Sequence, residues 1–311
     1  MNWLSEPTPA AVAAALRVAA PGLSGLPVTL PELPGGDDPV WRSVNAPLGA
    51  DFFVRFAWSE RAARFVRHEI SVLAALARSP AVPFLPEVVA SGTSPLILVT
   101  RRVPGSSLFT VAGSIGLDHA GQQLARFLAA LHSAASRQRV EAASGPVAAW
   151  YPLVTTDELR ERLGRWVSPG QQRIVVSWCD WADQTLAGPR PPVLVHADLH
   201  GDNMVWDGGR LRAVLDFTNV GTAEPEFDLR TFPGPGLGPD LELLAAIMRH
   251  YEPLAGRELS LDRVMAWHVR QALGDVLWRS EAGLPMADRR SPGEWVTDLE
   301  ARFRATRSVS W

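Results

Sequence analysis

The 311-residue sequence contains no lysine, so all 30 of its lysine-plus-arginine residues are arginines. It has a single cysteine, Cys179, which excludes an intrachain disulfide framework and a zinc site made of thiolates. No apolar run approaches the roughly 18 residues of a membrane-spanning helix. The alanine-rich start also lacks the basic segment of a signal peptide. We therefore expect a cytoplasmic protein that has no membrane partner.

The charge balance excludes another class of partner. The formal net charge is −3, whereas a nucleic-acid-binding domain is usually basic, with clustered cations. We expect no nucleic-acid partner. Hydrophobic residues make up 47% of the chain, enough for one large domain or two closely packed lobes. The twelve tryptophans, including Trp267 and Trp278, are expected mainly in the core.

The pattern along the chain changes after the first hundred residues. Short strand-like runs and amphipathic helices come first, including a helix starting at Thr8-Pro9, a hairpin in VWRSVNAPLGADFFVRFA, a helix over 59–78 and a strand in PLILVTRRVPG. The remainder is mainly helical, with strand-like runs at PVLVHADL and RLRAVLDF. Its helical patterns cover 118–137, 156–187, 240–254, 261–282 and 292–307. We predict a mixed α/β (α+β) fold with two lobes, 1–103 and 104–311.

One segment concentrates polar groups beside apolar strands. It holds His196, Asp198, His200 and Asn203, and Asp216 follows at a strand end after a Gly-Gly turn. Phosphoryl transfer needs such a set, because an aspartate orients the acceptor hydroxyl while an amide oxygen and a second carboxylate hold magnesium against the phosphates. The order of these residues predicts Asp198 as the catalytic group and Asn203 and Asp216 as metal ligands.

These residues carry a family resemblance. HADLHGDN resembles the HGDLHPGN loop of aminoglycoside and related small-molecule phosphotransferases, and VLDF resembles their magnesium-binding Asp-Phe element. The resemblance implies a protein-kinase-like fold, with Asp198 catalytic and Asn203 and Asp216 on Mg²⁺. It also implies that His196 supports the loop. EPEFDL resembles the family's Pro-x-x-Asp-Leu signature, in which Asp228 would support the catalytic loop.

The resemblance extends into the first lobe, which it identifies as nucleotide-binding. Arg55 lies where kinases usually have the lysine that grips the phosphates, and Glu69 matches its helix partner. ILVTRRVPG resembles the inter-lobe hinge, so backbone groups near Arg101 and Val103 are expected to meet the adenine. LPGGDDP is a candidate for the phosphate-covering loop, although a plain turn fits it as well.

The implied activity is transfer of the γ-phosphoryl group of ATP or GTP, with Mg²⁺, to a hydroxyl of a small molecule. A protein kinase is disfavoured because the chain lacks an Ala-Pro-Glu activation segment. An antibiotic, such as an aminoglycoside or another natural product, is the leading acceptor, and its inactivation the expected outcome. Metabolic kinases with homoserine-, choline- or sugar-like acceptors share the same catalytic segment and remain an alternative.

Two further alternatives stay open from the sequence. Arg55 in place of lysine, with a poor glycine loop, would suit a nucleotide-binding pseudokinase without turnover. The alternation His196, Asp198, His200 would suit a zinc or iron triad, because alternate residues of a strand share one face. The triad would leave Asn203 and Asp216 without roles. The part played by His200 is open in either case.

Overall fold

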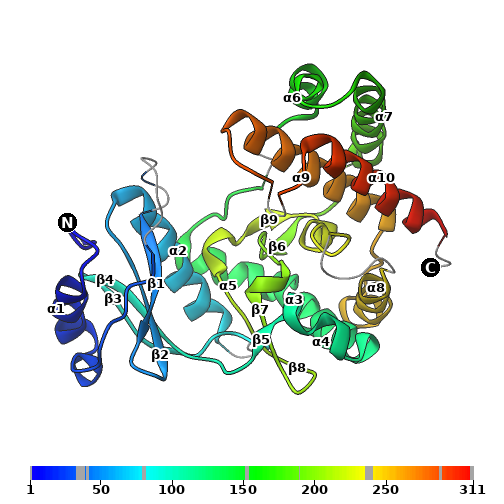
Figure 1. Cartoon of the computed structure of the whole chain (residues 1–311). Helices are drawn as coiled ribbons and strands as arrows, with labels where there is room; N and C mark the ends of the chain where they lie inside the picture. Colours follow the sequence, from blue (N-terminus) through cyan, green and yellow to red (C-terminus); the bar gives the residue numbers. More distant parts are fainter. Residues whose placement is uncertain are drawn as a thin grey trace. The chain divides into compact units, whose positions relative to one another are not determined.

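The computed structural model describes residues 2–32, 39, 42–78, 82–150, 154–188, 190–234, 241–286 and 289–308. The chain forms two compact units, each built from three segments (Figure 1). Unit 1 comprises Met1–Ser107, Ala134–Val147 and Asn203–Val220, and unit 2 comprises Leu108–Ser133, Ala148–Asp202 and Gly221–Trp311. The division of the lobes after residue 103 stays a prediction.

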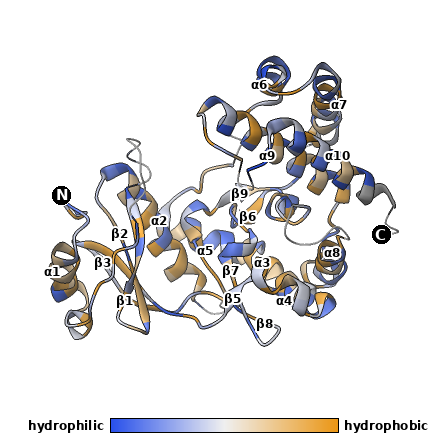
Figure 2. Ribbon diagram, in the orientation of Figure 1, coloured by the Kyte–Doolittle hydropathy of each residue, from blue (hydrophilic) through white to orange (hydrophobic). Residues whose placement is uncertain are grey.

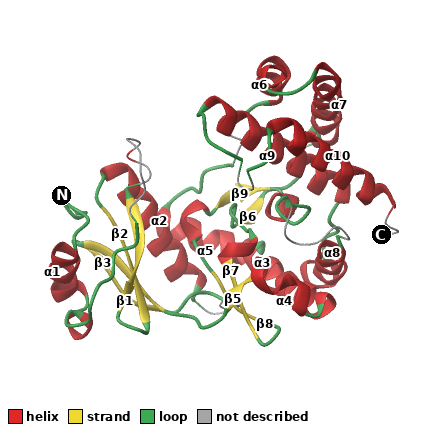
Figure 3. Ribbon diagram, in the orientation of Figure 1, coloured by secondary structure: helices red, strands yellow, loops and turns green. Residues whose placement is uncertain are grey.

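Unit 1 contains an antiparallel sheet (Figure 3). Its four strands are hydrogen-bonded in the order β1-β2-β4-β3. Its strands are β1 Ser43–Leu48, β2 Phe52–Ala57, β3 Val88–Thr93 and β4 Leu96–Arg101. The predicted hairpin is confirmed as the β1–β2 pair. Because side chains alternate across a strand, Val54 and Phe56 pack with helix α1 on one face, and Arg55 between them belongs to the other.

Each of the two helices that pack against this sheet begins after an N-terminal capping residue. Helix α1, Pro9–Ala19, follows Thr8, whose hydroxyl accepts a hydrogen bond from the Ala11 N–H at 3.2 Å. Helix α2, Glu60–Leu76, follows Ser59, which accepts from the Ala62 N–H at 3.1 Å. Both confirm predicted helices. Buried alanine and valine side chains of α2 pack with Ala57 and Leu96 of the sheet.

A second sheet of unit 1, in the order β5-β7-β8, leads to the candidate site. Its strands are β5 Ser106–Ser107, β7 Met204–Asp207 and β8 Arg210–Val214. Gly208 and Gly209 join β7 to β8 with φ of +54° and +75°, values that glycine adopts without strain. The predicted Gly-Gly turn is therefore confirmed, and β8 returns the chain to Asp216. Helix α5, Ala134–Ser144, packs against α2.

Unit 2 is mainly helical, with one two-stranded sheet of β6 and β9. Its elements are α3 Leu108–Val111, α4 Leu117–Leu131, α6 Thr156–Arg162, α7 Pro169–Leu186, β6 Val193–Val195, β9 Gly221–Ala223, α8 Glu242–Ala255, α9 Leu261–Glu281 and α10 Pro292–Ser308. The 3₁₀ turn η7 Pro225–Leu229 also belongs to unit 2, whereas η6 Phe217–Asn219 belongs to unit 1 and η5 Gly201–Asn203 ends on the first residue of a unit 1 segment.

Two predicted helices are each divided. The pattern over 118–137 is interrupted after Leu131, and α5 begins only at Ala134. The pattern over 156–187 is divided into α6 and α7, because Ser168 and Pro169 start a new helix with a capping box. The periodicity of apolar residues carried across both breaks, so it could not reveal them.

The core of unit 2 joins α6, α7, α9 and α10. Figure 2 shows hydrophobic and hydrophilic residues side by side along α9 and α10, as expected for helices that bury one face. Cys179 is buried in this core. Trp278 was expected in the core, but this is wrong, because it lies on the outer side of α9 and is 47% exposed.

Helices α4 and α8 pack closely in the same unit. A Cβ atom placed on Gly121 of α4 would lie 2.5 Å from the Cβ of Ala246 in α8, so only glycine permits this approach. Among the described residues, no helix combines the length and the apolar character needed to cross a bilayer.

Candidate active site

In unit 1, Arg55 of β2 faces Glu69 of α2. The Arg55 Nη1 atom lies 3.2 Å from Glu69 Oε2, and the side chains are only 16% and 5% exposed. Glu69 also accepts a hydrogen bond from the Phe217 N–H at 3.1 Å. The helix pattern had placed Glu69 among charged neighbours, but the residue is buried. The structure thus brings this predicted pair together.

Asp216 joins the same cluster from the end of β8. The Arg55 Nη1 atom donates to Asp216 Oδ1 at 3.2 Å, so one nitrogen bridges two carboxylates. Asp216 has a left-handed backbone with φ of +61°, and its carboxylate accepts from the Thr218 N–H at 3.4 Å and from the Thr218 hydroxyl. Its side chain remains 33% exposed, which leaves the carboxylate accessible to a ligand.

The charges of this cluster depend on one another. Burial acts to lower the pKa of Arg55, but the attraction of Glu69 and Asp216 outweighs it and raises the pKa above its usual value. Burial raises the pKa of Glu69, partly offset by Arg55. Arg55 therefore stays charged and anchors Asp216 in one direction.

Asn203 lies beside this cluster through the backbone. The Leu215 N–H donates to the Asn203 carbonyl at 2.8 Å, which places the backbone of Asn203 next to the residue that precedes Asp216. An amide oxygen and a carboxylate suit Mg²⁺, which prefers oxygen ligands and usually keeps waters and substrate phosphates as well. Asn203 and Asp216 therefore fit a magnesium ion held partly by a nucleotide. Their roles as ligands stay a prediction.

The described part of the chain contains no group of three or more His, Cys, Asp or Glu residues that could hold a metal by themselves. The zinc or iron triad considered for His196, Asp198 and His200 is therefore wrong. The backbone explains why: the Nδ1 atom of His196 accepts from the Asp198 N–H at 3.3 Å, and that of His200 accepts from the Asp202 N–H at 3.3 Å. The two rings serve the turns of the loop instead of sharing a strand face.

The predicted hinge residues lie at the end of β4. The Arg101 N–H donates to the Glu87 carbonyl at 2.9 Å, and its guanidinium pairs with the Glu87 carboxylate at 2.8 Å. Val103 follows after Arg102, whose N–H donates to the Asp51 carbonyl at 2.7 Å. Contact of Arg101 and Val103 with adenine stays a prediction. The candidate phosphate-covering loop LPGGDDP falls mostly outside the described residues.

Asp198 belongs to unit 2, where strand β6 leads into its loop. The buried His196 follows β6, and Ala197 comes next with φ of +65°, a left-handed conformation that is uncommon for a residue other than glycine. Asp198 is half-buried, with a side chain 35% exposed. The Nε2 atom of His200 lies 3.8 Å from Asp198 Oδ1, so this ring faces the predicted catalytic carboxylate.

Asp228, in η7, supports the loop that contains Asp198. Its carboxylate accepts from the His196 N–H at 2.9 Å and from the Ala197 N–H at 2.8 Å, and it is fully buried. His132 Nε2 lies 3.1 Å from the same carboxylate, and His132 Nδ1 lies 2.9 Å from the Tyr251 hydroxyl. Burial acts to raise the pKa of Asp228, but the hydrogen bond and charge of His132 and the contacts of His196 lower it. These contacts fit the support role predicted for Asp228 and His196.

Sequence reasoning missed three residues that hold this loop. His132, at the end of α4, contacts Asp228. Arg230 donates to the Ala197 carbonyl at 2.5 Å, and the Thr231 hydroxyl donates to the Leu199 carbonyl at 2.5 Å. The only signals were the Leu-His ending of the α4 pattern and the Arg-Thr pair directly after the Asp-Leu signature.

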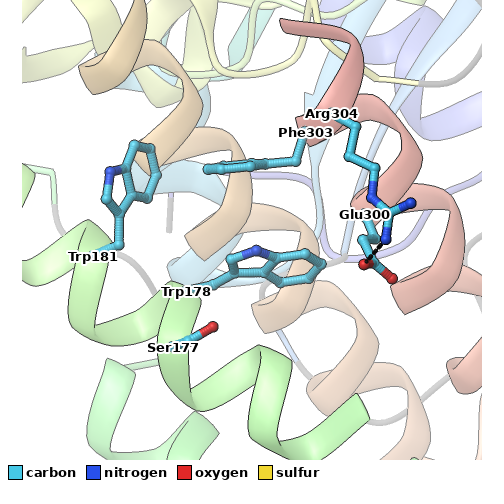
Figure 4. A pocket seen from close by; sticks show the side chains of 6 residues that line it. All are labelled: Ser177, Trp178, Trp181, Glu300, Phe303 and Arg304. Carbon is cyan, nitrogen blue, oxygen red and sulfur yellow. Dashed lines mark hydrogen bonds and ion pairs between the residues drawn. The ribbon is translucent and has the colours of Figure 1, made fainter. Parts of the chain in front are cut away.

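A pocket of about 360 Å³ lies elsewhere in unit 2, between α7 and α10 (Figure 4). Trp178 and Trp181 of α7 face Phe303 of α10, and the Phe303 and Trp181 ring centroids are 4.9 Å apart. The Glu300–Arg304 ion pair, with 2.6 Å between nitrogen and oxygen, lies at one side. None of the predicted site residues lines this pocket.

A small antiparallel sheet with α2 against it, a mainly helical second part and an Arg-Glu-Asp cluster at a strand end define a kinase-like α/β protein. The sequence narrows this class further. The chain belongs to the phosphotransferase enzyme family, whose model matches residues 29–271. That range includes every predicted site residue, so the resemblance seen in the sequence is confirmed.

Solved structures with the same fold are distant in sequence. The GDP complex of wild-type aminoglycoside 2'-phosphotransferase-IIIa is 17% identical, with a TM-score of 0.66 over 97% of this chain and 99% of that one. Macrolide 2'-phosphotransferase type I is 20% identical, with a TM-score of 0.60 over 95% and 97%. The apoenzyme of macrolide 2'-phosphotransferase MphH from Brachybacterium faecium is 22% identical, with a TM-score of 0.57 over 96% and 99%. No curated protein sequence matches this chain.

Proposed function

We propose that this phosphotransferase transfers the γ-phosphoryl group of ATP or GTP to a hydroxyl of an antibiotic, and so inactivates it. The observation that carries the proposal is the bridge that Arg55 makes between Glu69 and Asp216, with 3.2 Å to each carboxylate. Kinases need a cation held by a buried glutamate next to the metal-binding aspartate, because catalysis rests on positioning and charge stabilisation. A pseudokinase has no need to keep all three groups together.

Each residue has a role in this proposal. Asp198 orients the acceptor hydroxyl and accepts its proton, while its loop is fixed by the buried Asp228. Arg55 binds the nucleotide phosphates, and Glu69 holds its guanidinium. Asn203 and Asp216 would hold Mg²⁺, which when bound would neutralise charge on the phosphates.

The choice of acceptor is supported by family membership and by the names of the similar structures. Those structures include an aminoglycoside phosphotransferase with GDP and kanamycin, one with ATP and streptomycin, and two macrolide phosphotransferases. The first two are named as complexes with a nucleotide and an antibiotic, the other two are named after a class of antibiotic, and all share the fold at identities of 15% to 22%. Aminoglycosides and macrolides are therefore the acceptors to test first.

The test is a phosphorylation screen with purified protein, Mg²⁺ and ATP or GTP. Kanamycin, streptomycin and macrolides form one set of acceptors, and homoserine, choline and simple sugars form the other. We expect a product whose mass is raised by one phosphoryl group from an antibiotic. A product only from the metabolite set would identify a metabolic kinase instead. Nucleotide binding without any product would favour the pseudokinase.

Variants at two aspartates separate chemistry from folding. Asp198→Ala is expected to abolish turnover and to retain nucleotide binding. Asp207→Ala is the matched control, because Asp207 is an exposed aspartate at the end of β7 and has no predicted role. Full activity of Asp198→Ala would contradict the proposed mechanism.

A further inference from the structure

The loop that presents Asp198 is held by a buried arginine as well as by Asp228. We propose that Arg230 is a positioning residue for Asp198. By holding the peptide group that precedes Asp198, Arg230 fixes the direction of the catalytic carboxylate. This proposal rests on the proposed function, because it assigns Arg230 a share in the same reaction. All residues involved lie in unit 2.

Arg230 uses its guanidinium in several directions at once. One Nη donates to the Ala197 carbonyl at 2.5 Å, the other donates to the Phe227 carbonyl at 2.8 Å, and Nε donates to Gln271 Oε1 at 3.3 Å. The guanidinium also stacks on the Phe227 ring, 3.9 Å from its centroid. The residue is only 6% exposed. Burial of a charge is costly, so a buried arginine whose three nitrogens are all bonded indicates a fixed geometry.

The residue that Arg230 holds has an unfavourable conformation. Ala197 has φ of +65°, and its β-carbon disfavours this left-handed region. Its N–H donates to Asp228, and its carbonyl accepts from Arg230, so both polar groups are clamped from η7 and the residues after it. The clamp holds a conformation that alanine would otherwise leave. That conformation sets the direction in which the next residue, Asp198, points.

The support continues on both sides of the contact. The Thr231 hydroxyl donates to the Leu199 carbonyl, so the residue after Asp198 is held as well. Behind Arg230, its own carbonyl lies 2.7 Å from His268 Nδ1 of α9, and Gln271 of the same helix meets its guanidinium. Helix α9 therefore contacts both the backbone and the side chain of Arg230 and holds them in place.

The experiment measures phosphate release from magnesium–ATP and magnesium–GTP with water as the acceptor, so that no antibiotic needs to be identified. Arg230→Met is expected to lower kcat by about tenfold or more, with a smaller change in the KM for nucleotide. Ala197→Gly in the Arg230→Met background is expected to restore kcat by about fivefold or more, because glycine enters the left-handed region without the cost that alanine bears.

Arg263→Met is the matched control. Arg263 is also a buried arginine of unit 2, and it pairs with the Glu224 carboxylate and donates to the Thr185 carbonyl at 2.7 Å. Among the described residues, none of its hydrogen bonds or ion pairs is with residues 196–199. We expect Arg263→Met to lose stability similarly but to gain no kcat from Ala197→Gly. If Arg230 only stabilised the fold, Ala197→Gly would change kcat to the same extent in the Arg230→Met and Arg263→Met backgrounds.

Two further variants keep the test decisive. If Arg230→Met does not fold, Gln271→Met removes one partner of the guanidinium and is expected to lower kcat by about two- to fivefold, again with rescue by Ala197→Gly. If Asp198→Ala retains turnover, the proposed function is wrong and this role of Arg230 with it. If Asp198→Ala is inactive while Arg230→Met or Gln271→Met keeps the kcat of the unmodified chain, only the positioning role is wrong.

Discussion

Asp216 and Asp228 are close in sequence, yet the structure treats the two carboxylates in opposite ways. Asp216 remains 33% exposed, and Arg55 and Thr218 contact its Oδ1 atom. Asp228 is fully buried, with backbone N–H groups and His132 on both of its oxygens. The carboxylate of Asp216 is accessible to a ligand, whereas the carboxylate of Asp228 accepts hydrogen bonds from within the protein.

The comparison shows how to separate a binding carboxylate from a structural one. A carboxylate that accepts several internal hydrogen bonds in a buried place has little left to offer a substrate. One that is oriented by a cation but still open on one side can bind metal or phosphate-bound magnesium. Substitutions at the two positions should therefore affect different quantities, stability at Asp228 and turnover at Asp216.

The largest expected effect is on stability at Asp228. Asp228→Ala leaves the N–H groups of His196 and Ala197 without their acceptor, so we expect the free energy of unfolding to fall by about 3–5 kcal/mol. Urea unfolding followed by circular dichroism measures it. Asp118→Ala is the control, because Asp118 is an exposed aspartate whose pairing with Arg249 and His250 is open to solvent. Equal midpoints for both variants would contradict the structural role of Asp228.

The next effect is on turnover at Asp216. Asp216→Ala should lower kcat by about 10²–10³-fold, since it removes a group that stabilises charge during phosphoryl transfer. Its unfolding midpoint should change much less than that of Asp228→Ala, because the side chain is partly exposed. Steady-state kinetics at saturating Mg²⁺ and the same urea titration provide both numbers. If Asp216→Ala lost stability but kept its turnover, Asp216 would be a structural carboxylate and the comparison with Asp228 would be wrong.

The sequence predicted Asp216 as a binding carboxylate and Asp228 as a structural one, but not how deeply each is buried. Asp198, Asn203 and Asp216 stand in one short segment, so their types and order were visible. The support of the loop was less so, because His132 lies 96 residues from Asp228 and Arg230 lies 33 residues from Ala197. Such contacts depend on how α4 and η7 pack, which apolar periodicity does not specify.

The same limit applies to the fold. The cap at Thr8 predicted where α1 begins and the turn glycines predicted the β7–β8 turn, because these signals act within a few residues. They also divide the pattern over 156–187 at Ser168 and Pro169, but uninterrupted periodicity hid the break. The exposed position of Trp278 was missed because its environment is set by helices distant in the sequence.

A third prediction extends the comparison from buried carboxylates to a buried histidine. Burial, aided by Arg302, lowers the pKa of His268 to about 3. An unfolded histidine titrates near about 6.5, so the unfolded chain binds one more proton at pH values between these two. The contribution of neutral His268 to the free energy of unfolding is fully present above the unfolded pKa. It declines by about 1.4 kcal/mol per pH unit as the pH falls from the unfolded pKa towards the folded one.

Urea titrations at pH 7.0, 6.0 and 5.0 measure this decline, and His268→Gln is the comparison. Glutamine does not titrate, so the variant should start less stable and lose less on acidification. The Nδ1 atom of His268 lies 2.7 Å from the Arg230 carbonyl, and the Arg302 Nη1 atom lies 2.7 Å from its Nε2. Parallel pH curves for both proteins would show that His268 is not the group responsible.

The smallest effect is expected from Arg55→Lys, which introduces the lysine that kinases usually have at this position. A single nitrogen, Nη1, contacts both Glu69 and Asp216, and the buried Nε has no hydrogen-bond partner. The ammonium of a lysine has three donors and could make both contacts without burying an unsatisfied Nε. Arg55→Lys should therefore keep kcat and the KM for nucleotide within about threefold, whereas Arg55→Met should lose most of its turnover. A severe loss in Arg55→Lys would show that the phosphates require the planar fork of arginine, a requirement that two contacts from one nitrogen do not suggest.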